Sequence, residues 1–139
     1  VYGDNLLDLD LQAFFRFHRR PQPLVSVALF DRRRHLHPGI AGGWVTLEPD
    51  GRIKAFGEGG SNGDSFLVNA GVYLLEPEVV ADIPSGRVYD FGRDLFPALL
   101  VKGSAMYGYV ITGYCLGIDT PDSYHEAVRL VESGEVTLS

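Results

Sequence analysis

The chain has little of several features that would point to particular classes of protein. It holds one cysteine in 139 residues, Cys115, so no internal disulfide can form, as is usual in a reducing cytoplasm. No apolar run approaches the roughly 20 residues that a membrane-spanning helix needs, and no charged segment followed by an apolar one opens the chain. Bases do not outnumber acids, and the formal net charge of −6 argues against a nucleic-acid partner. We therefore expect a soluble cytoplasmic protein with no nucleic-acid and no membrane partner.

The composition is that of an ordinary globular domain. Hydrophobic residues make up 45% of the chain and charged residues 22%, and the length is sufficient to bury one core. No internal repeat or low-complexity tract divides the sequence. Residues 1–139 are therefore predicted to form a single domain.

Segments with the patterns of strands and of helices alternate along the chain. Strands are expected at residues 24–30, 66–75, 106–112 and 114–118, and helices at residues 9–19, 77–83, 91–101 and 120–131. Residues 43–47 and 52–56 flank Glu48-Pro49-Asp50-Gly51, which is a strong β-hairpin signal. Asp90 is a suitable N-cap for the third helix, which Pro97 should interrupt or shorten. This order predicts an α/β fold, with a mixed sheet, flanking helices and a β-hairpin insert.

The first residues read as the end of a strand rather than the start of a domain. Val1-Tyr2-Gly3 is followed by a turn at Asp4-Asn5, and nothing before it could be the rest of the strand or its neighbours. Unpaired backbone groups of a buried strand are costly, so we interpret the chain as a part whose N-terminal portion is missing from this sequence. The open sheet edge would pair with that missing segment, with a second chain, or with another copy in a homo-oligomer.

Two acidic residues stand at the carboxyl ends of expected strands. Asp4 follows Val1-Tyr2-Gly3, and Asp119 follows the strand that ends at Ile118. Ligands of open α/β sheets lie beyond such strand ends, and two carboxylates there can share a Mg²⁺ ion that bridges phosphates. On residue chemistry alone other readings stay open. A Gly-Asp-Asn triplet is more often a plain turn, and an Asp before Thr120-Pro121 is often only a helix cap.

The order of the segments is a stronger signal than any one of them. A series of motifs runs through nearly the whole chain: Gly3-Asp4-Asn5, residues 43–58, residues 68–75 with Asn69-Ala70-Gly71, residues 90–97, and residues 113–124 with Asp119-Thr120-Pro121. This series resembles the sugar-1-phosphate nucleotidyltransferases, with the mannose- or heptose-1-phosphate guanylyltransferases as the nearest branch. The resemblance covers the C-terminal part of such an enzyme and implies its Rossmann-like nucleotidyltransferase sheet.

The resemblance also implies a metal-dependent reaction. A sugar-1-phosphate oxygen would attack the α-phosphate of a nucleoside triphosphate, and pyrophosphate would leave; these two substrates are the partners it implies. By similarity, Asp4 and Asp119 would be the catalytic Mg²⁺ ligands, and Glu58 would accept hydrogen bonds from sugar hydroxyls. Three further residues would line the substrate pocket: Gly43, Asn69 and Gly71.

Three departures from the family's pattern bear on activity. Many members read Asp-Ile-Gly-Thr-Pro where this chain reads Gly117-Ile118-Asp119-Thr120-Pro121, so Asp119 and not residue 117 would be the ligand. Gly59 stands where the family usually places a Lys against the sugar phosphate, unless an arginine at position 32, 33 or 34 substitutes for it. The family's N-terminal Gly-rich phosphate loop is absent from the sequence, so we expect these 139 residues alone to be inactive.

Two other functions stay open. The chain would be a degenerate, non-catalytic domain if it bound a sugar phosphate or a partner subunit without depending on Mg²⁺. A metal-dependent glycosyltransferase would share the sheet, but the Asp8-Leu9-Asp10 spacing leads into a helix and not to a strand end. Four residues are interpreted as structural: His35 and His37 at the surface, Cys115 as a core thiol and Trp44 as a packing residue.

Overall fold

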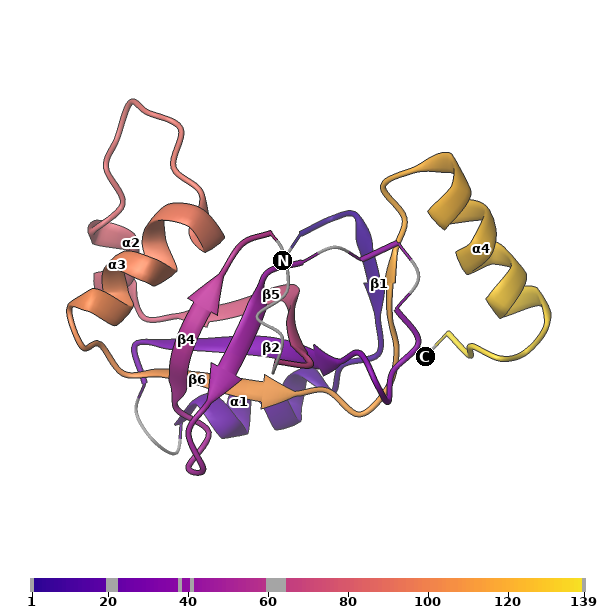
Figure 1. Cartoon of the computed structure of the whole chain (residues 1–139), viewed down its shortest axis with the longest axis horizontal. Helices are drawn as coiled ribbons and strands as arrows, with labels where there is room; N and C mark the ends of the chain where they lie inside the picture. Colours follow the sequence, from indigo (N-terminus) through magenta and orange to yellow (C-terminus); the bar gives the residue numbers. More distant parts are fainter. Residues whose placement is uncertain (1, 20–22, 38, 41, 60–64, 139) are drawn as a thin grey trace.

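Seven strands, four α-helices and one π-helical turn make up the described part of the chain. The computed structural model describes residues 2–19, 23–37, 39–40, 42–59 and 65–138. The elements are, in order, β1 (Asn5–Leu7), α1 (Leu11–Arg19), β2 (Val25–Asp31), β3 (Trp44–Leu47), β4 (Ile53–Gly57), β5 (Leu67–Leu75), α2 (Pro77–Ala81), η1 (Phe91–Leu95), α3 (Phe96–Val101), β6 (Met106–Val110), β7 (Cys115–Gly117) and α4 (Pro121–Glu132). Five strands form a mixed sheet in the order β4-β3-β5-β2-β6, and β1 pairs with β7 in a second, two-stranded sheet (Figure 1). The predicted mixed α/β architecture with flanking helices is confirmed.

Strand β2 is buried along its whole length. It pairs antiparallel with β5 and parallel with β6, so both edges of its backbone are hydrogen-bonded. A continuous apolar run of this length is typical of a strand that is covered on both faces. The strand predicted at residues 24–30 is confirmed, shifted by one residue at each end.

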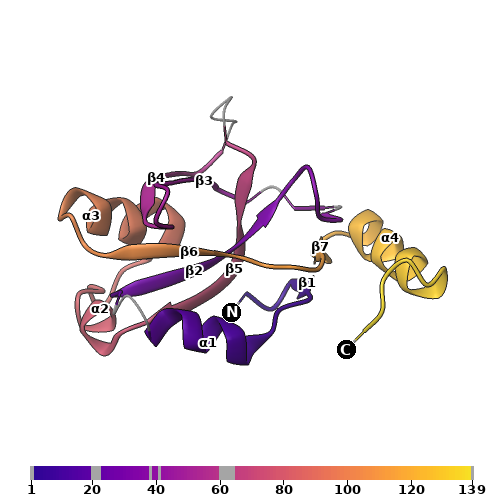
Figure 2. The same ribbon diagram turned by 90° about the horizontal axis from the view of Figure 1, so that it is seen from below.

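Helices cover both faces of the sheet around β2. On one face Val27 and Leu29 pack in a cluster that includes Phe96 of α3. On the other face Phe30 packs in a cluster that includes Phe14 of α1. Figure 2 shows α1 and α3 on opposite sides of these strands. Full burial of such a side chain contributes roughly 1.5–3 kcal/mol, so the two clusters fix how the helices lie on the sheet.

The β3–β4 hairpin forms where the turn signal places it. Gly51 adopts a φ of 86° and its N–H donates to the Glu48 carbonyl at 2.9 Å. A residue with a side chain is strained at such a φ, which explains the glycine at this position. Strand β3 also pairs with β5 at Trp44 and Val45, so the hairpin extends the sheet by two strands.

The helix predicted at residues 91–101 is interrupted by Pro97, as expected. Asp90 is the N-cap, and its Oδ1 accepts the Arg93 N–H at 2.8 Å. In a regular α-helix the Pro97 ring would collide with the carbonyl group four residues earlier. The preceding turn widens into η1 instead, and the Leu95 N–H donates to the Asp90 carbonyl five residues back at 3.1 Å. Helix α3 then begins at Phe96, and η1 leaves Arg93 in an exposed position.

The start of the chain differs from the prediction. Val1 lies outside the described residues, and Tyr2 opens a turn in which its N–H donates to the Gly71 carbonyl at 2.9 Å. The strand comes later, at Asn5–Leu7, and pairs antiparallel with β7. A strand of three residues carries too little pattern to be recognised in a sequence, because its partner lies more than 100 residues away.

Helix α4 stands beside β1 and β7, apart from the five-stranded sheet (Figure 1). It begins at the N-cap Thr120, which exchanges hydrogen bonds with Ser123, and Pro121 occupies its first turn. Leu130 packs against Leu116 of β7, and Gly134, at a φ of 77°, follows the helix end as predicted. Like the other helices in the described part of the chain, α4 is not long and apolar enough to cross a membrane.

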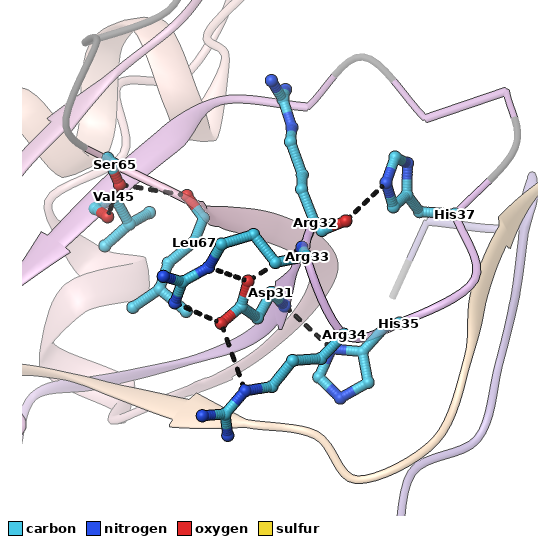
Figure 3. A network of polar contacts seen from close by, with 9 residues as sticks. All are labelled: Asp31, Arg32, Arg33, Arg34, His35, His37, Val45, Ser65 and Leu67. Carbon is cyan, nitrogen blue, oxygen red and sulfur yellow. Dashed lines mark hydrogen bonds and ion pairs between the residues drawn. The ribbon is translucent and has the colours of Figure 1, made fainter.

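A buried carboxylate ends β2 and organises the loop that follows (Figure 3). The Arg33 guanidinium donates to Asp31 from Nη2 at 2.8 Å and from Nε at 3.1 Å, and lies 4.0 Å from the centre of the Phe66 ring. These hydrogen bonds from Arg33 lower the pKa of Asp31 from 3.8 to about 2. The fold therefore favours the ionised carboxylate, whose contribution to stability is present above pH 4 and is lost as the pH falls toward about 2.

We predict that Asp31→Asn lowers the free energy of unfolding at pH 7 by about 1.5–3 kcal/mol, because it removes charge-assisted hydrogen bonds from a side chain that is 7% exposed. The difference from wild type should shrink between about pH 4 and pH 2. Urea unfolding at a series of pH values measures both effects. The control is Asp82→Asn, which breaks an exposed 2.9 Å ion pair with Lys102 and should cost at most about 1 kcal/mol. Equal losses in the two variants would contradict the assignment.

Candidate functional site

A cavity of about 300 Å³ lies where the five-stranded sheet meets the β1–β7 ribbon. All six site residues predicted from the sequence are among its lining residues. Within the part of the chain that the structure describes, the lining consists of Tyr2, Asp4, Asn5, Gly39, Ile40, Gly42, Gly43, Glu58, Asn69, Gly71, Asp90, Arg93 and Asp119. Residues from six separate segments therefore meet at one place, and the roles of the predicted ones stay predictions.

The two predicted metal ligands are carried by neighbouring backbones. Asn5 of β1 is paired with Gly117 of β7, and one residue further on the Ile118 N–H donates to the Asp4 carbonyl at 2.9 Å. Asp4 and Asp119 thus lie at the same end of the ribbon, and both residues line the cavity. The Ser123 hydroxyl lies 3.4 Å from Oδ1 of Asp119, which links that carboxylate to the first turn of α4.

The donor set suits a hard cation that also binds substrate. Asp4 and Asp119 offer carboxylate oxygens, and the described residues contain no cluster of three or more His, Cys, Asp or Glu that could hold a metal. Zinc sites use three or four protein ligands, mostly Cys and His with some Asp or Glu. Mg²⁺ is commonly held by one or two carboxylates, with water and substrate phosphates completing its shell. The residues present therefore fit Mg²⁺.

The backbone around Gly117 leaves no room for a side chain at this position. A Cβ atom on Gly117 would lie 2.7 Å from the Gly39 carbonyl oxygen. Gly39 itself has a φ of 79° and packs closely on the Ser123 side chain. No side chain fits at position 117 while residues 39–40 follow this path, whereas Asp119 lines the cavity two residues later.

Glu58 is held between two glycines. A Cβ atom on Gly43 would lie 2.7 Å from its Oε1, and a Cβ atom on Gly92 would overlap the same carboxyl group. Burial raises the pKa of Glu58, the Asp90 carboxylate raises it further, and Arg93 opposes the shift. The two glycines therefore let the main chain come close to the Glu58 carboxyl group and hold it at the cavity.

Arg93 is the functional candidate that sequence reasoning missed. Among the described lining residues it supplies the one guanidinium, from the first turn after the Asp90 cap. The arginines considered as substitutes for the absent lysine do not line the cavity, and two of them, Arg33 and Arg34, lie against Asp31 instead. The predicted N-cap was the available signal, because it places residue 93 in the first turn of a helix whose start faces the strand ends.

The residues interpreted as structural stay outside the cavity lining. His35 and His37 are half-buried, and each ring bonds to the main chain of the Arg-rich loop rather than standing free at the surface (Figure 3). Cys115 is buried in the core, as predicted, and this burial raises the pKa of its thiol to about 12. The Trp44 ring lies against Gly57 across the hairpin, so its packing role is confirmed.

Comparison with known proteins identifies the family. A family model described as nucleotidyl transferase matches residues 1–134. The chain belongs to this family. Curated relatives include UTP–glucose-1-phosphate uridylyltransferase of Synechocystis sp., 32% identical over 136 residues, and mannose-1-phosphate guanylyltransferase of Mycobacterium tuberculosis, 33% identical over 123 residues. The predicted resemblance to sugar-1-phosphate nucleotidyltransferases is confirmed.

Solved structures confirm the fold. HddC from Yersinia pseudotuberculosis superimposes with a TM-score of 0.68 at 21% identity, over 91% of this chain and 52% of that one. A Bacillus anthracis protein described as a glucose-1-phosphate thymidylyltransferase gives a TM-score of 0.74 at 16% identity, over 99% and 54%. The expected Rossmann-like nucleotidyltransferase fold is therefore present. The chain spans about half the length of these structures, and 34% and 33% of the two curated relatives above.

We predict that Gly92→Ala displaces the Glu58 carboxyl group from the cavity, because the new methyl group would occupy its place. The pKa of Glu58 should fall toward its ordinary value as the group leaves the buried position near Asp90. A ¹³C NMR titration of the Glu58 carboxyl group measures the change. Gly3→Ala is the control, since a Cβ atom there meets nothing within 4 Å. An unchanged titration of Glu58 in Gly92→Ala would show that the contact with Gly92 does not hold the carboxyl group.

Proposed function

We propose that the protein to which this chain belongs transfers a nucleotidyl group from a nucleoside triphosphate to a sugar 1-phosphate, giving a nucleotide-sugar and pyrophosphate. The observation that carries the proposal is that a chain of the nucleotidyl transferase family brings its six predicted site residues to one cavity. Its curated relatives are named for this type of transfer, with glucose, mannose and valienol 1-phosphates and three different bases.

The charge of the cavity supports a requirement for Mg²⁺. The described lining residues carry one guanidinium against four carboxylates, a formal charge of −3; the carboxylates are Asp4, Glu58, Asp90 and Asp119. A sugar phosphate would bind more weakly at such a site without a cation that offsets part of this charge. Asp4 and Asp119 are the pair that the β1–β7 ribbon brings together, so we assign the ion to them. When bound, Mg²⁺ would neutralise charge on phosphate oxygens.

Two residues recognise the sugar phosphate, a cation that binds its phosphate and a hydrogen-bond acceptor that binds its hydroxyls. Arg93 offers planar donors that suit phosphate oxygens, and it takes the part of the lysine that is absent at Gly59. Glu58 accepts hydrogen bonds from sugar hydroxyls, because Gly43 and Gly92 hold its carboxyl group at the cavity. A hydroxyl-rich ring with an anionic end therefore matches these two groups.

The proposed transfer asks little covalent chemistry of the protein. The attacking oxygen belongs to the sugar phosphate and the leaving group is pyrophosphate, so the residues align the reactants and offset their charge. Arg93 would hold the attacking phosphate, and Asp4 and Asp119 would hold the position of the cation. A preorganised set of charges of this kind is the usual source of rate enhancement in phosphoryl and nucleotidyl transfer.

Arg93→Gln should weaken binding of a sugar 1-phosphate by about tenfold or more, because it removes a charge-assisted hydrogen bond worth ~1.5–3 kcal/mol. Binding of the free sugar, which has no phosphate, should not change. Isothermal titration calorimetry with glucose 1-phosphate and mannose 1-phosphate in the presence of Mg²⁺ provides the measurement. Arg87→Gln is the matched control, since Arg87 is exposed, lies against Tyr89 and is not part of the cavity lining. Equal affinity in the two variants would refute the role of Arg93.

Asp119→Asn should raise the apparent dissociation constant for the metal by about tenfold or more, because it removes one of two ligand charges. Mn²⁺ titration followed by electron paramagnetic resonance reports the affinity directly. The control is Asp122→Asn, an exposed acid three residues further along, in the first turn of α4. A metal affinity that falls equally in both variants would indicate a general charge effect and not a ligand at position 119.

The reaction itself is tested by an assay for pyrophosphate release. The protein is given each nucleoside triphosphate with a panel of sugar 1-phosphates and Mg²⁺, and the same assay on these 139 residues alone tests the expectation that they give no turnover. Release that depends on both substrates and on Mg²⁺ supports the proposal. If the whole protein releases no pyrophosphate and binds sugar phosphate equally well with and without Mg²⁺, the non-catalytic alternative is favoured. Sugar transfer without pyrophosphate would favour a glycosyltransferase.

A further inference from the structure

Strand β5 contains a bulge beside the cavity. Its pairing with β2 joins Asn69 to Leu29 and Tyr73 to Val27, so residues 70–72 of β5 face a single residue of β2. Gly71, at the centre of the bulge, has a φ of 77°. Bulges of this kind redirect the main chain next to functional sites, and the left-handed φ explains why glycine stands here.

The Asn69 side chain caps this bulge and is held at both ends of its amide. Its Oδ1 accepts the Gly71 N–H at 2.9 Å, and its Nδ2 donates to the Tyr73 hydroxyl at 2.7 Å. The orientation of the amide follows from chemistry, because a backbone N–H must face the oxygen end. Asn69 is only 6% exposed, so both bonds are shielded from water. Its polar atoms are therefore engaged within the protein.

Tyr73 is fixed by the aromatic side chains around it. Its ring meets Phe96 at 5.0 Å and Phe91 at 5.5 Å between centroids, both edge to face. The Tyr2 ring packs on it at 5.8 Å from the cavity side. A hydroxyl on a ring packed in this way has a defined position, so it can orient the amide of Asn69.

The outer edge of the bulge holds the turn that carries Asp4. The Gly71 carbonyl accepts the Tyr2 N–H at 2.9 Å, and the Ala70 carbonyl accepts Nδ2 of Asn5 at 3.3 Å. A Cβ atom on Gly71 would lie 2.9 Å from both the Tyr2 ring and the Asn5 amide. Residues on each side of Asp4 are thus attached to the two carbonyl groups that the bulge turns outward.

We propose that Asn69 and Tyr73 are positioning residues for the Asp4 carboxylate. Tyr73 orients the Asn69 amide, the amide holds the Gly71 bulge, and the bulge holds the turn on both sides of Asp4. This reading gives Asn69 a different task from the sugar contact that the family resemblance implies. The claim about the bulge and the turn stands on the geometry alone, whereas its consequence for metal binding rests on the proposed function.

The test compares Tyr73→Phe and Asn69→Ala with Tyr107→Phe, a tyrosine on β6 outside the cavity lining. The first readout is hydrogen exchange at the Gly71 amide by NMR, together with the amide chemical shift of Asp4. The second is Mn²⁺ affinity, and the third is the affinity for glucose 1-phosphate without metal. Thermal unfolding monitors the fold of each variant.

Loss of one or two internal hydrogen bonds should accelerate exchange at Gly71 and weaken Mn²⁺ binding by about 3- to 10-fold in Tyr73→Phe, and more in Asn69→Ala. The Asp4 amide signal should move in both variants. Metal-free affinity for glucose 1-phosphate should stay at the wild-type value, and Tyr107→Phe should behave as wild type. This pattern would separate a positioning role from a sugar contact, which would change only the third readout.

Two outcomes would overturn the inference. In the first, hydrogen exchange at the Gly71 amide and the amide chemical shift of Asp4 stay unchanged in Tyr73→Phe. This result would show that the Tyr73 hydroxyl does not hold the bulge. A loss of sugar-phosphate affinity in Asn69→Ala with unchanged exchange and metal binding would return Asn69 to the sugar site. If wild type itself binds no Mn²⁺, the proposed function fails, and the two NMR readouts still decide whether Asn69 and Tyr73 position Asp4.

Discussion

The burial of β2 on both faces is the constraint on which the rest of the structure depends. Its side chains form part of two clusters, one with α3 and one with α1, and its edges bond β5 and β6. A strand held in this way cannot shift its register by one residue without exchanging its two faces. The position of the bulge in β5 is therefore set against a rigid neighbour, and so is everything that the bulge supports.

The cavity lies between this five-stranded sheet and the smaller β1–β7 ribbon. Glu58 and Arg93, the residues proposed to contact the sugar phosphate, come from elements that belong to, or pack on, the five-stranded sheet. Asp4 and Asp119 come from the β1–β7 ribbon, whose strands have three residues each. The ribbon is attached to the main sheet by hydrogen bonds to the bulge and by the contact of Gly117 with Gly39. Cys115 of the ribbon also packs in the cluster that contains Phe14 and Phe30. The proposed sugar side is thus built into the main sheet, and the proposed metal side is attached to it.

Much of the fold follows from local patterns in the sequence. The apolar run of β2, the turn of the β3–β4 hairpin, the Asp90 cap and the helix after Thr120 are each specified by neighbouring residues. The bulge at Gly71 and the pairing of β1 with β7 depend on partners distant in the chain, which no local pattern reveals. The site divides in the same way. The acids at strand ends and the ordered motifs led to six lining residues, whereas Arg93 and Tyr2 join them only through the path of the folded main chain.

The contact between Gly39 and Gly117 has a consequence for how such a site can change. Because the two backbones touch, a side chain at position 117 requires residues 39–40 to take another course. A chain that carries Asp at that place must therefore differ in this loop as well. The residue at position 117 and the path of the loop at residues 39–40 can then change only together. If only the residue at position 117, or only the loop, were transferred from another member of the family, the two backbones would no longer fit together.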